Sequence, residues 1–171
     1  AYDEDALLIY TRSTSEGLFE FKASTTYNYS VKEVLNAIRD YDRYPEWSYK
    51  TKEFRVLERI NEDKHYSYSI VDFPFPMKDR DVIMYSETSY LADKSVQINM
   101  KAKADKIAKT DYVRMDNIYG FWKLIPLSID KTKVIYQIAS DTNGMPIWVV
   151  ELFGLEAPKG NLKGLRKIIG K

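Results

Sequence analysis

The sequence contains no cysteine and only one histidine, His65, among its 171 residues. Without cysteine there is no disulfide framework and no thiolate chemistry. Zinc sites are not expected either, because their usual ligands are cysteine and histidine side chains. His65 follows the polar turn 61–64, so we expect an exposed side chain there rather than a general base.

Net charge is almost absent as well: 26 Lys and Arg residues against 25 Asp and Glu residues leave a formal charge of +1. A protein that binds nucleic acid is expected to carry a basic excess or a basic stripe. Here the two signs are interspersed, and acidic residues dilute even the densest basic segment, 101–111. Such a segment is typical of a solvated surface, so the composition predicts no nucleic-acid partner.

Long apolar runs and phosphate-binding motifs are also missing. No run approaches the roughly 20 apolar residues of a membrane-spanning helix. There is no glycine-rich phosphate loop and no Gly-x-Ser-x-Gly nucleophile motif, so no cofactor is expected. The chain begins at Ala1 rather than at methionine, which fits removal of a signal peptide as well as a trimmed chain. Periplasmic, secreted and cytoplasmic locations therefore stay open.

Aromatic side chains, by contrast, are abundant: the sequence has 14 Tyr, 7 Phe and 3 Trp. Aromatic residues favour strands, so a β-rich core accounts for them. A pocket lined by aromatic rings is the second interpretation. Hydrophobic residues make up 44% of the chain, which suffices for the core of one domain spanning residues 1–171.

Hydrophobic periodicity predicts strands around two helices. Ser30 and Glu33 form a capping-box pattern at the start of a short amphipathic helix that ends near Tyr41. Pro146 opens an apolar C-terminal helix, which Pro158 is expected to kink or interrupt. This order of elements predicts a single α+β domain. Alternation of apolar and polar residues predicts strands over 5–12, 18–27, 52–60, 64–72, 80–90, 95–102, 112–127 (with a bulge near Gly120) and 132–141.

Three short motifs narrow this architecture to a known family. Residues 73–82, FPFPMKDRDV, resemble the PWP-x-x-x-RD stretch of START (steroidogenic-acute-regulatory-related lipid transfer) domains, with Phe75 in place of the usual Trp. Residues 44–47, YPEW, are similar to the family's Y-P-x-W turn, and residues 120–127, GFWKLIPL, to its G-x-W-x-x-x-P strand. The chain looks most similar to bacterial stand-alone members. The resemblance implies a helix-grip fold, in which a curved antiparallel sheet wraps around a long C-terminal helix and encloses an apolar cavity.

The strand residues whose side chains are predicted to point inward form the expected cavity wall. The resemblance implies that a ligand occupies this cavity. Met84 and Met100 suit an adaptable apolar wall. On the last helix, Trp148, Leu152 and Leu155 fall on one stripe that could close the cavity. The predicted ligand-binding residues are Tyr68, Ile70, Arg80, Met84, Ile98, Met100, Trp122, Leu124, Tyr136, Trp148 and Leu152.

The charged segment 78–81 at the start of a strand is open to two interpretations. Alternation places Arg80 on the opposite face from Asp79 and Asp81, but it does not say which face is inward. Such a segment is most often a solvated edge or a structural ion pair. In the alternative, Arg80 or Asp81 points into the cavity and anchors the polar head of a ligand. Because a buried charge is costly, an inward Arg80 would need a carboxylate partner or an acidic ligand.

No catalytic constellation stands out, and the function that we expect is non-enzymatic binding of a hydrophobic ligand, for transfer or sensing. A sterol, a fatty acyl lipid, a phospholipid and an isoprenoid all fit. We expect a monomer with transient membrane contact, gated by the last helix and the 73–77 loop. The alternative is a polyketide cyclase- or hydrolase-like enzyme that uses Tyr66, Tyr68 or Tyr136 as acid or base. A third interpretation is a protein-interaction module with a filled interior.

Overall fold

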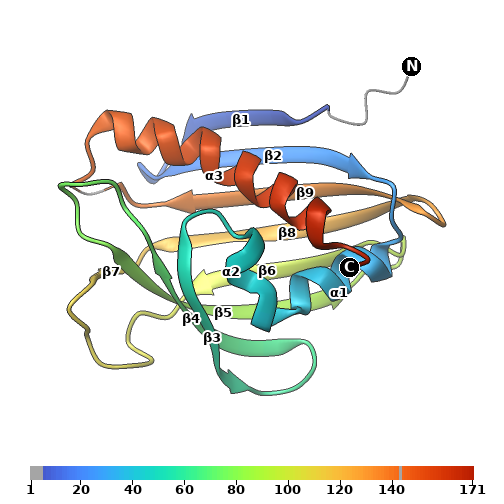
Figure 1. Ribbon diagram of the computed structural model, residues 1–171, viewed down its shortest axis with the longest axis horizontal. Coiled ribbons are helices and arrows are strands. Elements are labelled where there is room, and N and C mark those ends of the chain that lie inside the picture. The colour runs from blue at the N-terminus through green and yellow to red at the C-terminus, as the bar shows by residue number, and fades with distance from the viewer. Residues whose placement is uncertain (1–5, 143) are drawn as a thin grey trace.

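The structure, a computed structural model, describes residues 6–142 and 144–171 (Figure 1). In these residues a curved sheet of nine strands lies against a long C-terminal helix, α3 (Ile147–Ile168). The strands are β1 (Leu8–Ser13), β2 (Phe19–Tyr27), β3 (Thr51–Arg59), β4 (Lys64–Val71), β5 (Arg80–Tyr90), β6 (Val96–Ala102), β7 (Val113–Met115), β8 (Ile118–Ser128) and β9 (Lys131–Ser140).

The sheet has the order β1-β2-β9-β8-β6-β5-β4-β3. The short strand β7 pairs in parallel with β5, and the other neighbouring strands are antiparallel. This arrangement confirms the predicted α+β helix-grip fold. Residue 5, where the first predicted strand begins, lies outside the described residues. The predicted segment 112–127 is divided into β7 and β8, because its first part joins β5 rather than the antiparallel path.

Two short helices close one end of the inner face of the sheet, and the first begins as predicted. In α1 (Val31–Arg39) the Ser30 hydroxyl accepts from the Glu33 amide at 3.3 Å. The Glu33 carboxylate accepts in return from the Ser30 amide at 2.8 Å, so the capping box is confirmed. After the 3-10 turn η1 (Tyr41–Arg43), the helix α2 (Tyr44–Trp47) places the buried Trp47 edge-on against Trp122, with ring centroids 6.0 Å apart.

The bulge predicted near Gly120 is wrong. Pairing between β8 and β9 continues in register through Gly120, and the irregularity lies between Pro126 and Ser128. A Cβ atom at Gly120 would overlap the carbonyl oxygen of Gln137 on β9. Glycine is therefore required there because two backbones approach closely.

The C-terminal helix runs for 22 residues through Pro158, so of the two predicted effects, a kink or an interruption, the interruption does not occur. Its C-terminal half is anchored by the buried side chains of Leu162 and Leu165. The Tyr27 hydroxyl also donates to the Leu162 carbonyl oxygen. These contacts hold the helix after the proline, and the buried side chains of Val149 and Val150 hold it before the proline. Together they compensate for the backbone hydrogen bond that proline removes.

A buried ion pair fixes the outer side of the sheet. Asp81 is 0% exposed and accepts from the Arg114 Nε and Nη2 atoms at 2.7 and 3.0 Å. The hydroxyls of Thr110 and Tyr68 donate to the same carboxylate at 2.6 and 3.2 Å. Burial raises the pKa of Asp81, but the bonds from Arg114 and Thr110 outweigh it and hold the pKa below its usual value. The interpretation of this charged segment as a structural ion pair is thus confirmed for Asp81.

Replacing Asp81 with alanine is expected to lower the free energy of unfolding by about 3–5 kcal/mol, because the Arg114 charge loses its partner in a buried position. Urea denaturation of Asp81→Ala measures this loss. The matched control on the same strand is Glu87→Ala, which breaks a half-exposed pair with Lys64 at 3.2 Å and is expected to cost less than about 1 kcal/mol. Equal losses in the two variants would contradict this role for the buried pair.

Candidate functional site

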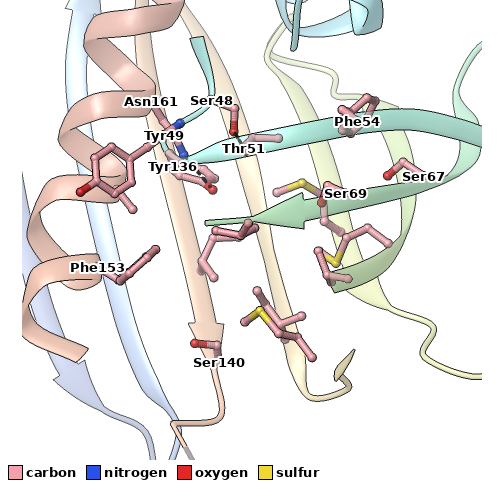
Figure 2. Close-up of a pocket in the computed structure, with 18 of the residues that line it drawn as sticks. Ser48, Tyr49, Thr51, Phe54, Ser67, Ser69, Tyr136, Ser140, Phe153 and Asn161 are labelled. Atoms are coloured by element: carbon pink, nitrogen blue, oxygen red, sulfur yellow. Dashed lines mark hydrogen bonds between the residues drawn. The ribbon is translucent and has the colours of Figure 1, made fainter. Parts of the chain in front are cut away.

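A cavity lies between the inner face of the sheet and the N-terminal half of α3. The centres of water-sized molecules can occupy about 220 Å³ of it. Its wall consists of aromatic, aliphatic and hydroxyl side chains, and none of the wall residues in the described part of the chain is Asp, Glu, Lys or Arg. Figure 2 shows the two sides of the cavity, with Phe153 of α3 on one side and Ser67 and Ser69 of β4 on the other. The third interpretation, a protein with a filled interior, is therefore not supported.

Five of the predicted ligand-binding residues line this cavity. Met84 lies on β5, Ile98 and Met100 lie on β6, and Trp122 and Tyr136 lie on β8 and β9. The rings of Trp122 and Tyr136 stack with centroids 4.0 Å apart. The period-two alternation therefore placed these side chains on the correct face of the sheet.

The residues predicted from α3 do not line the cavity. Trp148 is 47% exposed and Leu155 is 50% exposed, and Leu152 is not part of the wall. The helix is apolar nearly all round over 147–155, so its sequence did not indicate which face is covered. The wall residues of α3 are Val150, Phe153, Gly154, Ala157 and Asn161.

The side chains of strand β4 point to the opposite faces of the sheet from those predicted. Tyr68 and Ile70 are buried on the outer face, in a separate cluster with Ile83 that is covered by Leu57 and Ile107. Tyr66 is on the same outer face, with its ring 4.2 Å from the Lys106 ammonium group. Because the loop after β6 covers this face, both sides of β4 are buried, and the larger side chains lie outside. The inward residues are His65, Ser67, Ser69 and Val71.

Leu124 and Arg80 are also absent from the cavity wall. Leu124 is fully buried in the solid core that includes Val34 of α1, because α1 fills that end of the inner face. Arg80 is 9% exposed, and its guanidinium lies 4.9 Å from the centroid of the Phe73 ring. Its buried Nε atom has no hydrogen-bond partner among the described residues. Burial lowers the pKa of Arg80, and the Asp141 charge partly offsets this effect.

Asp79 completes the charged segment and has a structural role. Its carboxylate accepts from the Phe73 amide at 3.1 Å and from the Lys52 ammonium group at 2.6 Å. It therefore ties the loop before β5 to β3, outside the cavity.

Hydrogen bonds along one edge of the cavity join α3 to the start of β3. The Asn161 side-chain oxygen accepts from the Tyr49 amide at 2.6 Å, and its nitrogen donates to the Tyr136 hydroxyl at 3.4 Å (Figure 2). Ser48 and Thr51 share a hydrogen bond of 2.8 Å. Because Asn161 uses both ends of its amide in this way, it fixes the distance between α3 and the sheet.

His65 is buried in the cavity wall, so the prediction of an exposed histidine is wrong. It is 8% exposed, and its Nδ1 atom lies 3.4 Å from the Tyr41 hydroxyl. Burial lowers the pKa of His65 to about 4, helped by the charges of Arg59 and Arg39. The imidazole is therefore neutral at physiological pH. The sequence did contain a signal for an inward histidine, because His65 alternates with Tyr66 at the start of a strand.

The site has few of the groups that catalysis requires. Among the three tyrosines considered as acid or base, only Tyr136 lines the cavity. Burial raises its pKa above the usual value for tyrosine, which makes it a poor general acid near neutral pH. No group of three or more potential ligands for a metal ion occurs among the described residues. No helix in that part of the chain is long and apolar enough to span a membrane.

Comparison with known proteins agrees with the fold, which is that of solved StAR-related lipid transfer proteins. The chain belongs to the family described as polyketide cyclase / dehydrase and lipid transport, whose model matches residues 27–166. An uncharacterized protein of Pseudomonas aeruginosa is 29% identical over 174 aligned positions, which cover 100% of this chain and 86% of that protein.

Solved structures show the same fold at low sequence identity. A STAR-related lipid transfer protein of Xanthomonas axonopodis matches with a TM-score of 0.89 and 24% identity, covering 100% of this chain and 97% of that one. Human StAR-related lipid transfer protein 5 matches with a TM-score of 0.81 and 15% identity, covering 96% and 82%. A START superfamily protein of Mycobacterium smegmatis matches with a TM-score of 0.60 and 15% identity, covering 88% and 96%.

The low pKa of His65 gives a testable dependence of stability on pH. A histidine whose pKa is lower in the folded state than in the unfolded state binds more protons when unfolded, so acid favours unfolding. The free energy of unfolding is therefore expected to decrease as the pH falls from about 6.5 to about 4. Since His65 is the only histidine, NMR titration of its imidazole measures the pKa directly, and His65→Gln should lack this part of the pH dependence. A pKa near 6.5 in the folded protein would contradict the buried, neutral state.

Proposed function

We propose that the protein, acting as one domain over residues 1–171, binds a hydrophobic molecule in the cavity and transfers or senses it without chemical change. The observation that carries this proposal is the cavity itself, with aromatic and aliphatic walls and no charged side chain in the described part of the wall. Burial of apolar ligand surface contributes about 25 cal/mol per Å² before the costs of ordering are subtracted. The five predicted residues in the wall, with Phe153 and Val150 from α3, supply this contact.

The ligand enters between α3 and the loop over residues 72–79. The loop and the helix meet where the rings of Phe73 and Phe153 stack, with centroids 4.4 Å apart. Such a contact can open without breaking hydrogen bonds of the sheet. Phe75 in this loop is 94% exposed, and Ile147 and Trp148 at the start of α3 are exposed as well. These side chains are suited to transient contact with a membrane surface while the ligand passes.

A second candidate function is catalysis of the polyketide cyclase type, which the description of the family also names. Tyr136 is the candidate residue for this reaction, because its hydroxyl lies in the wall and bonds to Asn161. Turnover of a poly-β-keto substrate that disappears in Tyr136→Phe would favour the enzyme. Unchanged, slow background conversion in both proteins would favour the carrier.

Filling the cavity tests the proposed binding function. Met100→Trp places a large ring in the wall, and binding of Nile red, an uncharged dye that fluoresces in apolar sites, is expected to weaken at least about tenfold. The matched control is Asn99→Trp, which adds the same ring to the neighbouring, exposed position on β6 and should leave dye affinity unchanged. Fluorescence titration measures both affinities, and thermal unfolding verifies that both variants fold. Equal affinities in the two variants would contradict binding in this cavity.

A further inference from the structure

The inner faces of β4 and β5 carry several of the polar groups of the cavity wall. His65 and Ser67 on β4 and Ser86 on β5 point inward and line the cavity. They are 8%, 5% and 6% exposed, respectively. His65 lies directly opposite Ser86 in the strand pairing, and Ser67 is the next inward residue along β4. These three residues, the polar subsite, form one patch at one end of the cavity.

The hydroxyl groups of the polar subsite have no hydrogen-bond partner within residues 6–142 and 144–171. No side-chain hydrogen bond joins Ser67 or Ser86 to another residue in the described part of the chain. Elsewhere in the wall, the hydroxyls of Ser48 and Thr51 bond to each other. A buried hydroxyl without a partner costs about 1–3 kcal/mol. The hydroxyls of the polar subsite are therefore suited to bond a polar group of a ligand.

The polar subsite lies at the end of the cavity that is remote from the proposed opening. Along β4, Val71 lies six positions after His65, which corresponds to roughly 20 Å of extended strand. Val71 leads into the loop whose Phe73 packs against α3. A ligand that reaches the polar subsite thus enters with its polar group first and leaves its apolar body along the aromatic wall.

The groups around the polar subsite favour an uncharged ligand. His65 is neutral, and the Tyr41 hydroxyl that faces it is neutral as well. Arg59 and Arg39 also act on His65 through their charges, but neither lines the wall. Arg39 binds Asp63 at 2.6 Å, and the Arg59 guanidinium lies 5.7 Å from the centroid of the Tyr41 ring. Arg80 is at the opposite end of β5, where it pairs with Val71. A carboxylate or phosphate at the polar subsite would lose its hydration without an ion pair to a residue of the described wall, which is costly.

We infer that the ligand is a lipid with an uncharged polar group, a hydroxyl or a carbonyl, which is hydrogen-bonded by Ser67, Ser86 and His65 at the deep end of the cavity. This inference rests on the proposed binding function and narrows its ligand class. It favours neutral lipids such as sterols and isoprenoid or fatty alcohols over fatty acids and phospholipids.

Matched pairs of ligands test this inference. Hexadecanol is compared with hexadecanoate, and a sterol with its sulfate ester, by displacement of Nile red at a pH at which the acids are ionised. The neutral member of at least one pair is expected to bind about tenfold more tightly than its charged partner, a difference of about 1.4 kcal/mol. Tighter binding of the charged members, lost in Arg80→Gln, would overturn the inference and place the polar head at Arg80.

Removing the hydroxyls identifies the polar subsite itself. The double variant Ser67→Ala/Ser86→Ala is expected to bind the neutral alcohol about tenfold more weakly and to keep its affinity for Nile red. It should unfold at the same temperature or higher, because no protein hydrogen bond is lost. The control Ser89→Ala, at an outward position of β5, should bind the alcohol as the wild type does.

The outcomes separate this inference from the binding function. Displacement of Nile red by both members of each pair with equal affinity, or an unchanged alcohol affinity in the double variant, overturns the inference and leaves the carrier intact. Failure of Nile red and of every lipid to bind contradicts the proposed function, and the inference with it.

Discussion

One long helix, α3, lies across the inner face of a much wider sheet (Figure 1), and the rest of the structure depends on this constraint. At its C-terminal end, α3 packs closely, because a Cβ atom at Gly164 would overlap the backbone of Trp47. Toward its N-terminus the helix presents Phe153 and Ala157 to a space that the sheet does not fill. Close packing at one end holds the helix in place, and the unfilled space at the other end is the cavity.

The outer side of the sheet makes the polar inner wall possible. The Asp81–Arg114 pair holds the loop after β6 against β4 and β5, because Arg114 also donates to the carbonyl oxygens of Ala104 and Ala108 at 2.7 and 3.0 Å. Tyr68 and Ile70 are then buried outside the cavity. Strand β4 gains its apolar burial on that side, and its inner side can carry serine and histidine without loss of the core.

The sequence predicted the fold well, because the fold follows from local signals. Two of these signals depend only on neighbouring residues: the capping box of Ser30 and Glu33, and the alternation in β5, β6, β8 and β9. The motifs of residues 73–82 and 120–127 indicated the family by their resemblance. The phase of β4 could not be predicted, because a loop more than 30 residues later in the chain covers its outer face. The wall face of α3 was likewise undetermined, because nearly all residues over 147–155 are apolar. His65 was misplaced because the polar turn before it suggested an exposed position, whereas it lies on the inner side of β4.

The central claim is that the cavity holds a hydrophobic molecule that the protein carries unchanged. Native mass spectrometry of protein purified without detergent, followed by organic extraction of the bound material, tests it most directly. The account predicts one molecule of an uncharged lipid for each chain, recovered chemically intact. The mass of the chain alone, together with failure to take up sterols or long-chain alcohols added in excess, would contradict it.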